Sequence, residues 1–192
     1  MMQGILLQIQ NWDHRLLFWM EKIHTPFFDA FFSKLTLLGE AGIFWIVVAV
    51  LLLCFPKTRG CGKAMALALL LIFLLGNCLL KPWLARPRPF SLYPELTLLI
   101  TPPTDFSFPS GHTYASIASA VVLLKHFPRW GIGAMVLALL IAFSRLYLQV
   151  HFFTDILGGI LLGLFAATIA ISLIPHSKKV LPKGDTAKGR ND

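Results

Sequence analysis

The chain has 192 residues, of which 56% are hydrophobic and only 14% charged, and its mean hydropathy is +0.71. A soluble domain of this length has a smaller apolar share and about a quarter of charged residues, so we expect one compact domain integral to a membrane. The formal net charge of +8 could suggest a nucleic-acid partner. The basic residues mostly flank apolar runs, however, and a lipid bilayer explains them without nucleic acid.

Residues 1–38 mix charged with apolar side chains. In the stretch GILLQIQNWDHRLLFWMEKI, Asp13, Arg15 and Glu21 are interleaved with Leu, Phe and Trp. This pattern predicts amphipathic helices that lie in the membrane interface, with a crossing of the membrane by part of the segment as the alternative. A cleaved signal peptide is not expected, because no basic start leads into a clean apolar core with a small-residue cleavage site.

Five apolar runs follow within residues 39–175, the predicted transmembrane domain. The third run is the weakest, and its Ser, Thr and Ala residues suit a helix packed against other helices rather than against lipid. We therefore predict an all-α, polytopic membrane helix bundle of about five to six transmembrane helices. The runs are residues 41–55, extended backwards through Glu40, and then 64–80, 112–124, 130–147 and 156–175.

Basic residues predict the orientation of the bundle. Most of them lie in the connections 56–63 and 125–130 and in the tail 176–192, which five spans place together on the cytoplasmic side. The tail itself is expected to be disordered. The other two connections then face outward, and their basic residues break the trend and need another explanation: Lys81, Arg86, Arg88 and Arg145.

The outward stretch SRLYLQVHFFTD, residues 144–155, lies between two strongly apolar runs. Charged groups at membrane depth cost roughly 3 kcal/mol or more each, so they are rarely retained without a partner or a task. His151 and Asp155 are four residues apart, which allows the carboxylate to bond one ring nitrogen and leave the other free. A chain break near residues 148–151 would bring Arg145 to them. A buried pair that only fixes helix packing is the alternative.

The other outward connection contains KPWLARPRPF, residues 81–90, and FPSGHT, residues 108–113. Its prolines predict that the preceding helix stops near Leu80 and that the basic residues lie on an irregular segment. Arg86 is expected to reach lipid headgroups. Ser110 and Gly111 directly precede the third run, where backbone N–H groups at a helix N-terminus can bind an anion. Ordinary helix capping would also explain them, but not His112.

The predicted outward face combines three cations, a helix N-terminus and two histidines. This combination suits phosphoryl transfer. Fixed positive groups stabilise the charge on the equatorial oxygens, one histidine can attack, and the other can protonate the leaving oxygen. No carboxylate, His or Cys cluster has metal-ligand spacing. We therefore expect no metal and no other cofactor.

The three motifs together resemble the signature of the type 2 phosphatidic acid phosphatase family of membrane lipid phosphatases. The pattern is Lys81-x6-Arg88-Pro89, then Pro109-Ser110-Gly111-His112, then Ser144-Arg145-x5-His151-x3-Asp155. The resemblance implies that His151 is the nucleophile that forms a phosphohistidine, Asp155 its orienting partner and His112 the general acid. It also implies that the phosphate is held by Lys81, Arg88, Ser110, Gly111 and Arg145.

Members of this family often have six spans, and here the first is missing or replaced by the amphipathic segment. The resemblance implies a lipid phosphatase in the cell membrane, and the distribution of basic residues predicts that its site lies at the extracytoplasmic face. We expect undecaprenyl diphosphate as substrate, with phosphatidylglycerophosphate and phosphatidic acid as alternatives. A lipid phosphotransferase using the same site and a non-enzymatic transporter are the other candidate functions. A transporter predicts charges spread through the spans, whereas here they gather at one face.

Overall fold

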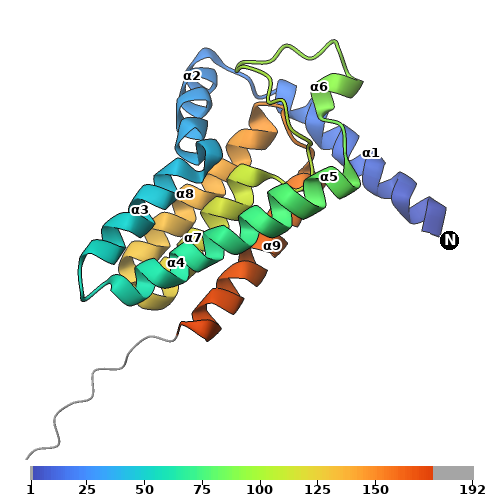
Figure 1. Cartoon of the computed structure of the whole chain (residues 1–192). Coiled ribbons are helices and arrows are strands. Elements are labelled where there is room, and N and C mark those ends of the chain that lie inside the picture. Colours follow the sequence, from blue (N-terminus) through green and yellow to red (C-terminus); the bar gives the residue numbers. More distant parts are fainter. Residues whose placement is uncertain (1, 175–192) are drawn as a thin grey trace, which may run out of the picture.

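The computed structural model describes residues 2–174, and every regular element in that range is a helix (Figure 1). The predicted all-α membrane bundle is confirmed, with four helical stretches long and apolar enough to cross a membrane. The predicted disordered tail, residues 176–192, lies outside the described residues.

The N-terminal segment forms two helices, α1 (Met2–Glu21) and α2 (Pro26–Leu35). Pro26 is the first residue of α2, and the Thr25 hydroxyl accepts the Phe28 N–H at 3.3 Å, which is the usual start of a helix. α2 continues into η1 (Thr36–Gly42), and a kink at Glu40 and Ala41 separates it from α3 (Ile43–Cys54). The first candidate span is residues 26–54, so it begins inside the segment predicted to lie in the interface.

The second candidate span, residues 59–92, combines several helical forms. α4 (Arg59–Ile72) passes into the π-helix η2 (Phe73–Leu80) and then α5 (Lys81–Leu84), and α6 (Pro89–Leu92) follows. The helix continues past the predicted stop near Leu80 to Leu84, so the predicted irregular segment is wrong for Lys81 and is confirmed for Arg86 and Arg88. The chain tolerates Pro82 because it is among the first residues of α5, after the π-helical turn has already changed the hydrogen-bond pattern.

Three helices complete the bundle: α7 (Gly111–His126), α8 (Pro128–Tyr147) and α9 (Phe153–Leu173). α8 and α9 are the remaining candidate spans, whereas α7 has 16 residues and is almost entirely buried. Its expected packing against other helices is confirmed. Gly159 and Gly163 of α9 let the helices approach closely, because a Cβ at Gly163 would lie 2.9 Å from the Tyr114 carbonyl oxygen.

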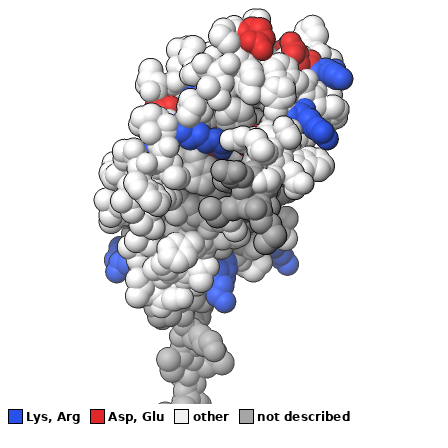
Figure 2. Space-filling model, turned by 90° about the vertical axis from the view of Figure 1, so that its right-hand side faces the viewer, with Lys and Arg blue, Asp and Glu red and all other residues white. Residues whose placement is uncertain are grey.

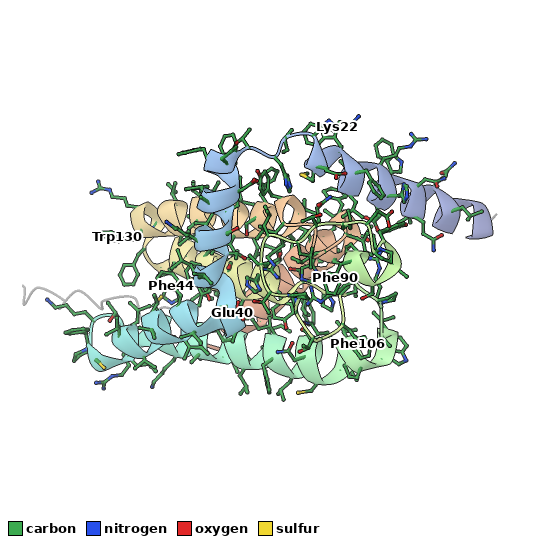
Figure 3. All side chains as sticks on the ribbon, turned by 90° about the horizontal axis from the view of Figure 1, so that it is seen from above. Lys22, Glu40, Phe44, Phe90, Phe106 and Trp130 are labelled. Carbon is green, nitrogen blue, oxygen red and sulfur yellow. The ribbon has the colours of Figure 1, made fainter. Side chains whose placement is uncertain are left out.

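The connections of the bundle gather at two opposite ends (Figure 1). The α3–α4 and α7–α8 turns lie at one end, and the α8–α9 turn, α1 and the long connection 93–110 lie at the other. Viewed from above, α1 runs along one edge of the molecule and α4 along the opposite edge, and the chain around Phe90 and Phe106 lies between them (Figure 3). The charged residues predicted to carry chemistry are at this second end.

Candidate active site

His151 lies in the short turn between α8 and α9. Helix α8 ends at Tyr147 and α9 begins at Phe153, which is the chain break predicted near residues 148–151. Gln149 has a φ of 54°, so the turn reverses the chain within a few residues. His151 is 1% exposed and Arg145, in the last turn of α8, is 2% exposed. The break brings both side chains to one cavity.

The hydrogen bonds of His151 define which ring nitrogen is free to react. Its Nε2 lies 3.1 Å from Nη1 of Arg88. A guanidinium can only donate, so Nε2 must accept and carries no proton. The proton is then on Nδ1, which lies 3.5 Å from Oδ2 of Asp155 and 3.4 Å from the Ser107 hydroxyl. The ring thus presents an unprotonated Nε2 among cations, as a nucleophile requires.

Asp155 is completely buried behind His151, in the first turn of α9. Its Oδ2 accepts the Phe152 N–H at 2.8 Å and the Ser107 hydroxyl at 2.5 Å. Its Oδ1 accepts from Arg86 at 2.5 Å. The N-terminus of α9 favours a carboxylate at this place, and these bonds fix its orientation toward the ring.

Burial lowers the pKa of His151 well below its usual value, and the charges of Arg88, Arg145 and Lys81 lower it further. Asp105 opposes this shift. His151 is therefore neutral at neutral pH, in agreement with the hydrogen bond that its Nε2 accepts.

The three predicted phosphate-binding cations are buried in one place. Lys81, Arg88 and Arg145 are 6%, 4% and 2% exposed. They belong to a cavity of about 1140 Å³, which six of the predicted site residues line: Lys81, Arg88, Gly111, His112, Arg145 and His151. Arg145 bonds the Thr36 hydroxyl through Nη1 at 2.6 Å, while its buried Nε has no hydrogen-bond partner. An anion in the cavity could satisfy such a group.

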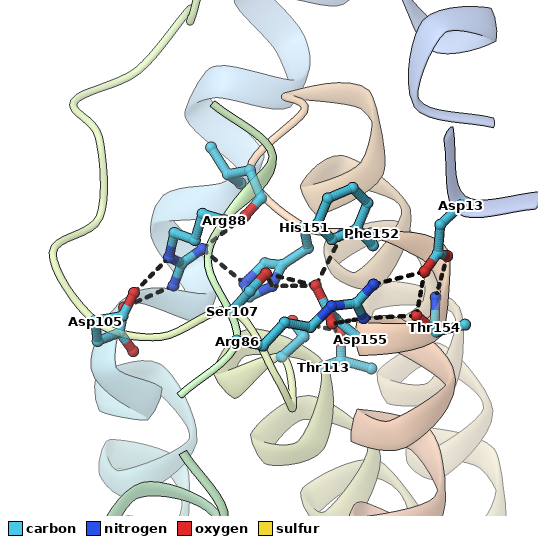
Figure 4. Close-up of polar contacts among 12 residues, drawn as sticks. Asp13, Arg86, Arg88, Asp105, Ser107, Thr113, His151, Phe152, Thr154 and Asp155 are labelled. Carbon is cyan, nitrogen blue, oxygen red and sulfur yellow. Dashed lines mark hydrogen bonds and ion pairs between the residues drawn. The ribbon is translucent and has the colours of Figure 1, made fainter. Parts of the chain in front are cut away.

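Asp105 holds two of these cations. Lys81 bonds its Oδ2, and Arg88 donates to its Oδ1 at 2.6 Å, as Figure 4 shows for Arg88. Burial raises the pKa of Asp105, but its bonds to Lys81 and Arg88 outweigh burial and bring the pKa to about 2. The Asp105 side chain is 50% exposed, so the carboxylate occupies the mouth of the cation cluster.

His112 faces the same cavity from the start of α7. Its Nε2 is buried without a hydrogen-bond partner, and Oε2 of Glu40 lies 3.8 Å away. Gly39 makes room for the ring, since a Cβ there would come within 2.4 Å of the His112 Cδ2 atom. A group with an unsatisfied ring nitrogen beside the cations is well placed to exchange a proton with a bound phosphate ester.

Ser110 and Gly111 play different parts. Gly111 lines the cavity, and a Cβ on it would lie 3.8 Å from Nζ of Lys81. Ser110 is completely buried, its N–H donates to the Asp155 carbonyl at 3.1 Å, and its hydroxyl accepts from Thr113 at 3.0 Å. Its backbone N–H is therefore engaged in holding α7 to α9, and the predicted phosphate contact of Ser110 stays a prediction.

A family model described as PAP2 superfamily matches residues 62–179, more than half of the chain. The chain belongs to the PAP2 superfamily. The matched range includes all three motifs, so the resemblance predicted from them is confirmed.

Named relatives support this membership. An undecaprenyl-diphosphatase of Sulfolobus acidocaldarius is 35% identical over 130 residues, which cover 67% of this chain and 63% of that protein, so the match spans less than two thirds of its length. Phosphatidylglycerophosphatase B of Bacillus subtilis is 33% identical over 159 residues, or 74% of this chain and 73% of the relative.

Solved structures show the same fold. The crystal structure of a transmembrane PAP2-type phosphatidylglycerolphosphate phosphatase from Bacillus subtilis has a TM-score of 0.73 and 29% identity, and the match covers 91% of this chain and 90% of that one. LpxE of Aquifex aeolicus gives a TM-score of 0.72, also with 29% identity, and covers 82% and 93% of the two chains.

Within this PAP2 site, sequence reasoning misplaced Arg86. It was expected to reach lipid headgroups, but its Nη1 bonds Asp155 and its Nη2 bonds Asp13 at 2.7 Å. The side chain is 27% exposed, and its guanidinium lies 4.4 Å from the centre of the Phe152 ring. The sequence carries only a weak signal for this role, since Pro87 after Arg86 restricts the backbone and not the direction of the side chain.

Asp105, Ser107 and Asp13 were also missed. Asp105 is an acid in a basic connection, which is a weak signal of an ion pair. Nothing in the sequence marks Ser107 or Asp13, since their partners lie 48 and 73 positions away along the chain.

The cavity also has a long apolar part. It extends from the cations between α3 and α4, where it is lined by Ala49, Val50, Leu53, Ala66, Leu69 and Leu70. The charged end of this PAP2 cavity therefore opens into an apolar groove among membrane-spanning helices.

Proposed function

We propose that this protein is an integral membrane lipid phosphatase that works through a phosphohistidine on His151. The observation that carries this proposal is the position of His151, whose unprotonated Nε2 faces Arg88 in the cation cavity while Nδ1 faces Asp155. Membership of the PAP2 superfamily supports the same chemistry.

In the first step, Nε2 of His151 attacks the terminal phosphorus, and the bond from that phosphorus to the leaving oxygen of the lipid breaks. This oxygen is the bridging oxygen of a diphosphate or the ester oxygen of a monophosphate. Burial and the charge of Arg145 lower the pKa of His112, and the negative charge of a bound phosphate opposes this and favours the protonated ring, which gives its proton to the leaving oxygen. The phosphorylated ring carries a positive charge, which Asp155 stabilises through Nδ1–H. Lys81, Arg88 and Arg145 surround the transferring phosphoryl oxygens, and Gly111 lets the helix terminus approach them.

In the second step, water attacks the phosphohistidine and the N–P bond breaks. His112, now neutral, takes a proton from that water and is ready for another cycle. Inorganic phosphate leaves, and His151 returns to its neutral form with the proton on Nδ1. Every proton in this sequence moves between water, His112 and the lipid oxygen.

A lipid is the substrate class that best fits the cavity. The phosphate end holds three buried cations, and the groove between α3 and α4 suits an apolar chain. The relatives are named for undecaprenyl diphosphate, phosphatidylglycerophosphate and lipid A. We favour undecaprenyl diphosphate, with phosphatidylglycerophosphate and phosphatidic acid as alternatives.

We also propose that the site opens to the extracytoplasmic face of the cell membrane. Basic residues concentrate in the connections at the other end of the bundle, which the positive-inside trend assigns to the cytoplasm. Both acidic and basic side chains are visible at the upper end in Figure 2, whereas the lower end displays basic ones.

Phosphate release from purified lipids in detergent tests this function. We expect release from at least one of three lipids: undecaprenyl diphosphate, phosphatidylglycerophosphate or phosphatidic acid. Activity should be full in EDTA, because no group of three His, Cys, Asp or Glu residues suited to a metal occurs among residues 2–174. Vanadate should inhibit by occupying the cation cavity. Absence of release from all three lipids, or loss in EDTA with recovery in Mg²⁺, would contradict the proposal.

A further inference from the structure

Asp13 is a buried carboxylate on α1, on the same side of the helix as the buried Leu17 and Met20. It is 2% exposed, while Leu7, Trp12 and Trp19 of the same helix are 60%, 63% and 50% exposed. A charge is retained in such a place only when it is paired and hydrogen-bonded. The mechanism described above makes no use of Asp13.

The partners of Asp13 lie at the start of α9 and beside the first motif (Figure 4). Its Oδ1 accepts the Thr154 N–H at 2.9 Å, and its Oδ2 accepts the Thr154 hydroxyl and Nη2 of Arg86, the latter at 2.7 Å. Arg86 also donates from Nη1 to the Thr154 hydroxyl at 2.7 Å. Asp13 thus bonds Arg86, which itself bonds Asp155, and Thr154, which precedes Asp155 in the chain.

The guanidinium of Arg86 bonds two carboxylates, one with each of its Nη atoms. Nη2 bonds Asp13 and Nη1 bonds Oδ1 of Asp155. An arginine that faces a single carboxylate tends to bind it with both nitrogens. Here Asp13 occupies one side of the fork, so Asp155 gives Arg86 only Oδ1 and keeps Oδ2 for Ser107, the Phe152 N–H and His151.

We propose that Asp13 is a positioning residue of the active site. By holding Arg86, it keeps Asp155 oriented toward Nδ1 of His151, and so links the N-terminal helix to the nucleophile. This inference rests on the proposed function, in which His151 is the nucleophile and Asp155 its partner.

Attachment of α1 to the bundle is the simpler role for Asp13, but other contacts already provide it. Gln149 donates from Nε2 to the Leu17 carbonyl at 3.0 Å, and Leu17 packs with Phe152 and Leu96. Attachment of α1 does not require a charged side chain, whereas an ion pair with one side of the Arg86 guanidinium does.

The substitution Asp13→Asn tests the inference, with Asp29→Asn as the matched control. Asn keeps the shape of Asp13 and an oxygen for the Thr154 N–H, but it removes the charge that holds Arg86. Asp29 belongs to α2 and accepts the Tyr147 hydroxyl at 2.5 Å, away from Asp155. We expect Asp13→Asn to lower kcat on the order of tenfold to a hundredfold with KM unchanged, and Asp29→Asn to leave both constants unchanged.

A double-mutant cycle distinguishes positioning from a general loss of folded protein. In an Asp155→Asn background, Asp13→Asn should have almost no further effect on kcat, because its action passes through Asp155. A purely structural role would reduce activity by the same factor in both backgrounds, and that result would overturn the inference.

If Asp13→Asn yields no folded protein, Arg86→Lys provides the same test. Lysine keeps the charge but cannot hold two carboxylates in a planar fork, so kcat should again fall while KM is retained. An unchanged kcat would overturn the inference alone. A wild-type protein that releases no phosphate from any lipid would instead overturn the proposed function, and the inference with it.

Discussion

Asp105 bonds two of the cations that we propose as phosphate ligands, Lys81 and Arg88, so we expect it to compete with a phosphate that enters the cavity. Phosphate and carboxylate are both negative, so they compete for the same donors. With a pKa of about 2, Asp105 is charged at any working pH, and its competition does not fade as the pH falls toward neutral or mildly acidic values.

We expect Asp105→Asn to strengthen inhibition by vanadate. A half-exposed ion pair contributes about 1 kcal/mol, which corresponds to roughly a fivefold lower inhibition constant. The measurement is the vanadate dependence of phosphate release, with Glu95→Gln on the same connection as the control. A vanadate affinity that is unchanged or weaker in Asp105→Asn would show that Asp105 does not compete.

At the level of single residues, the sequence predicts the cations and histidines but not the network behind them. Lys81, Arg88 and Arg145 could be identified because each is a charge beside an apolar run, where only a task or a partner explains it. Ser107 and Asp13 could not, because a serine in a loop and an acid in an amphipathic helix are ordinary. Their roles arise from tertiary contacts that no local pattern encodes.

At the scale of helices, the close approach of α7 and α9 places the motifs together. Gly111 and His112 begin α7, and Asp155 lies in the first turn of α9. The two helices can approach because Gly159 and Gly163 carry no side chain where α7 passes: a Cβ at Gly159 would lie 2.9 Å from the Thr113 Cβ. Packing at these glycines therefore helps set the distance between His112 and Asp155, the proposed general acid and the proposed partner of the nucleophile.

Gly163→Ala should destabilise the protein by about 1–3 kcal/mol, since its Cβ would press on the Tyr114 carbonyl and on Ile117. Gly133→Ala is the control, because a Cβ there meets nothing within 4 Å. In that exposed helical position alanine should be neutral or slightly stabilising. Thermal unfolding of both variants in the same detergent measures the difference. Equal melting temperatures would contradict the packing argument.

Helix boundaries were predicted less well than helix identity. The apolar runs indicated each main helix, because membrane spans need long apolar stretches. The helix through Lys81 continues past the predicted stop because a π-helical turn precedes Pro82. The first candidate span starts at Pro26, but it is kinked: Glu40 is extended, and Ala41 and Gly42 have φ angles of 47° and 69°, so α3 begins anew after them.

For the whole molecule, the proposed orientation places the connections near the site outside the cell membrane and those at the other end of the bundle in the cytoplasm. Ser91, near the site, and Lys57, between α3 and α4, are both exposed and lie at opposite ends of the bundle. Cys61 is 1% exposed, so it is a poor reporter of either side.

In a variant whose three native cysteines are replaced by alanine, Ser91→Cys should react with an impermeant thiol reagent in intact cells. Lys57→Cys should react only after the membrane is opened, because it lies on the predicted cytoplasmic side. Labelling of each site is measured on the isolated protein. The reverse pattern would place the active site in the cytoplasm and favour lipids of the inner leaflet.

The proposed phosphatase chemistry depends on His151, and the activity of His151→Ala is its decisive test. Phosphate release by the wild type, by His151→Ala and by the control His126→Ala is compared at equal amounts of folded protein. His126 is 8% exposed at the far end of α7. We predict that His151→Ala lowers kcat at least on the order of a thousandfold and that His126→Ala retains activity. Activity of His151→Ala near that of the wild type would contradict the assignment of His151 as the nucleophile.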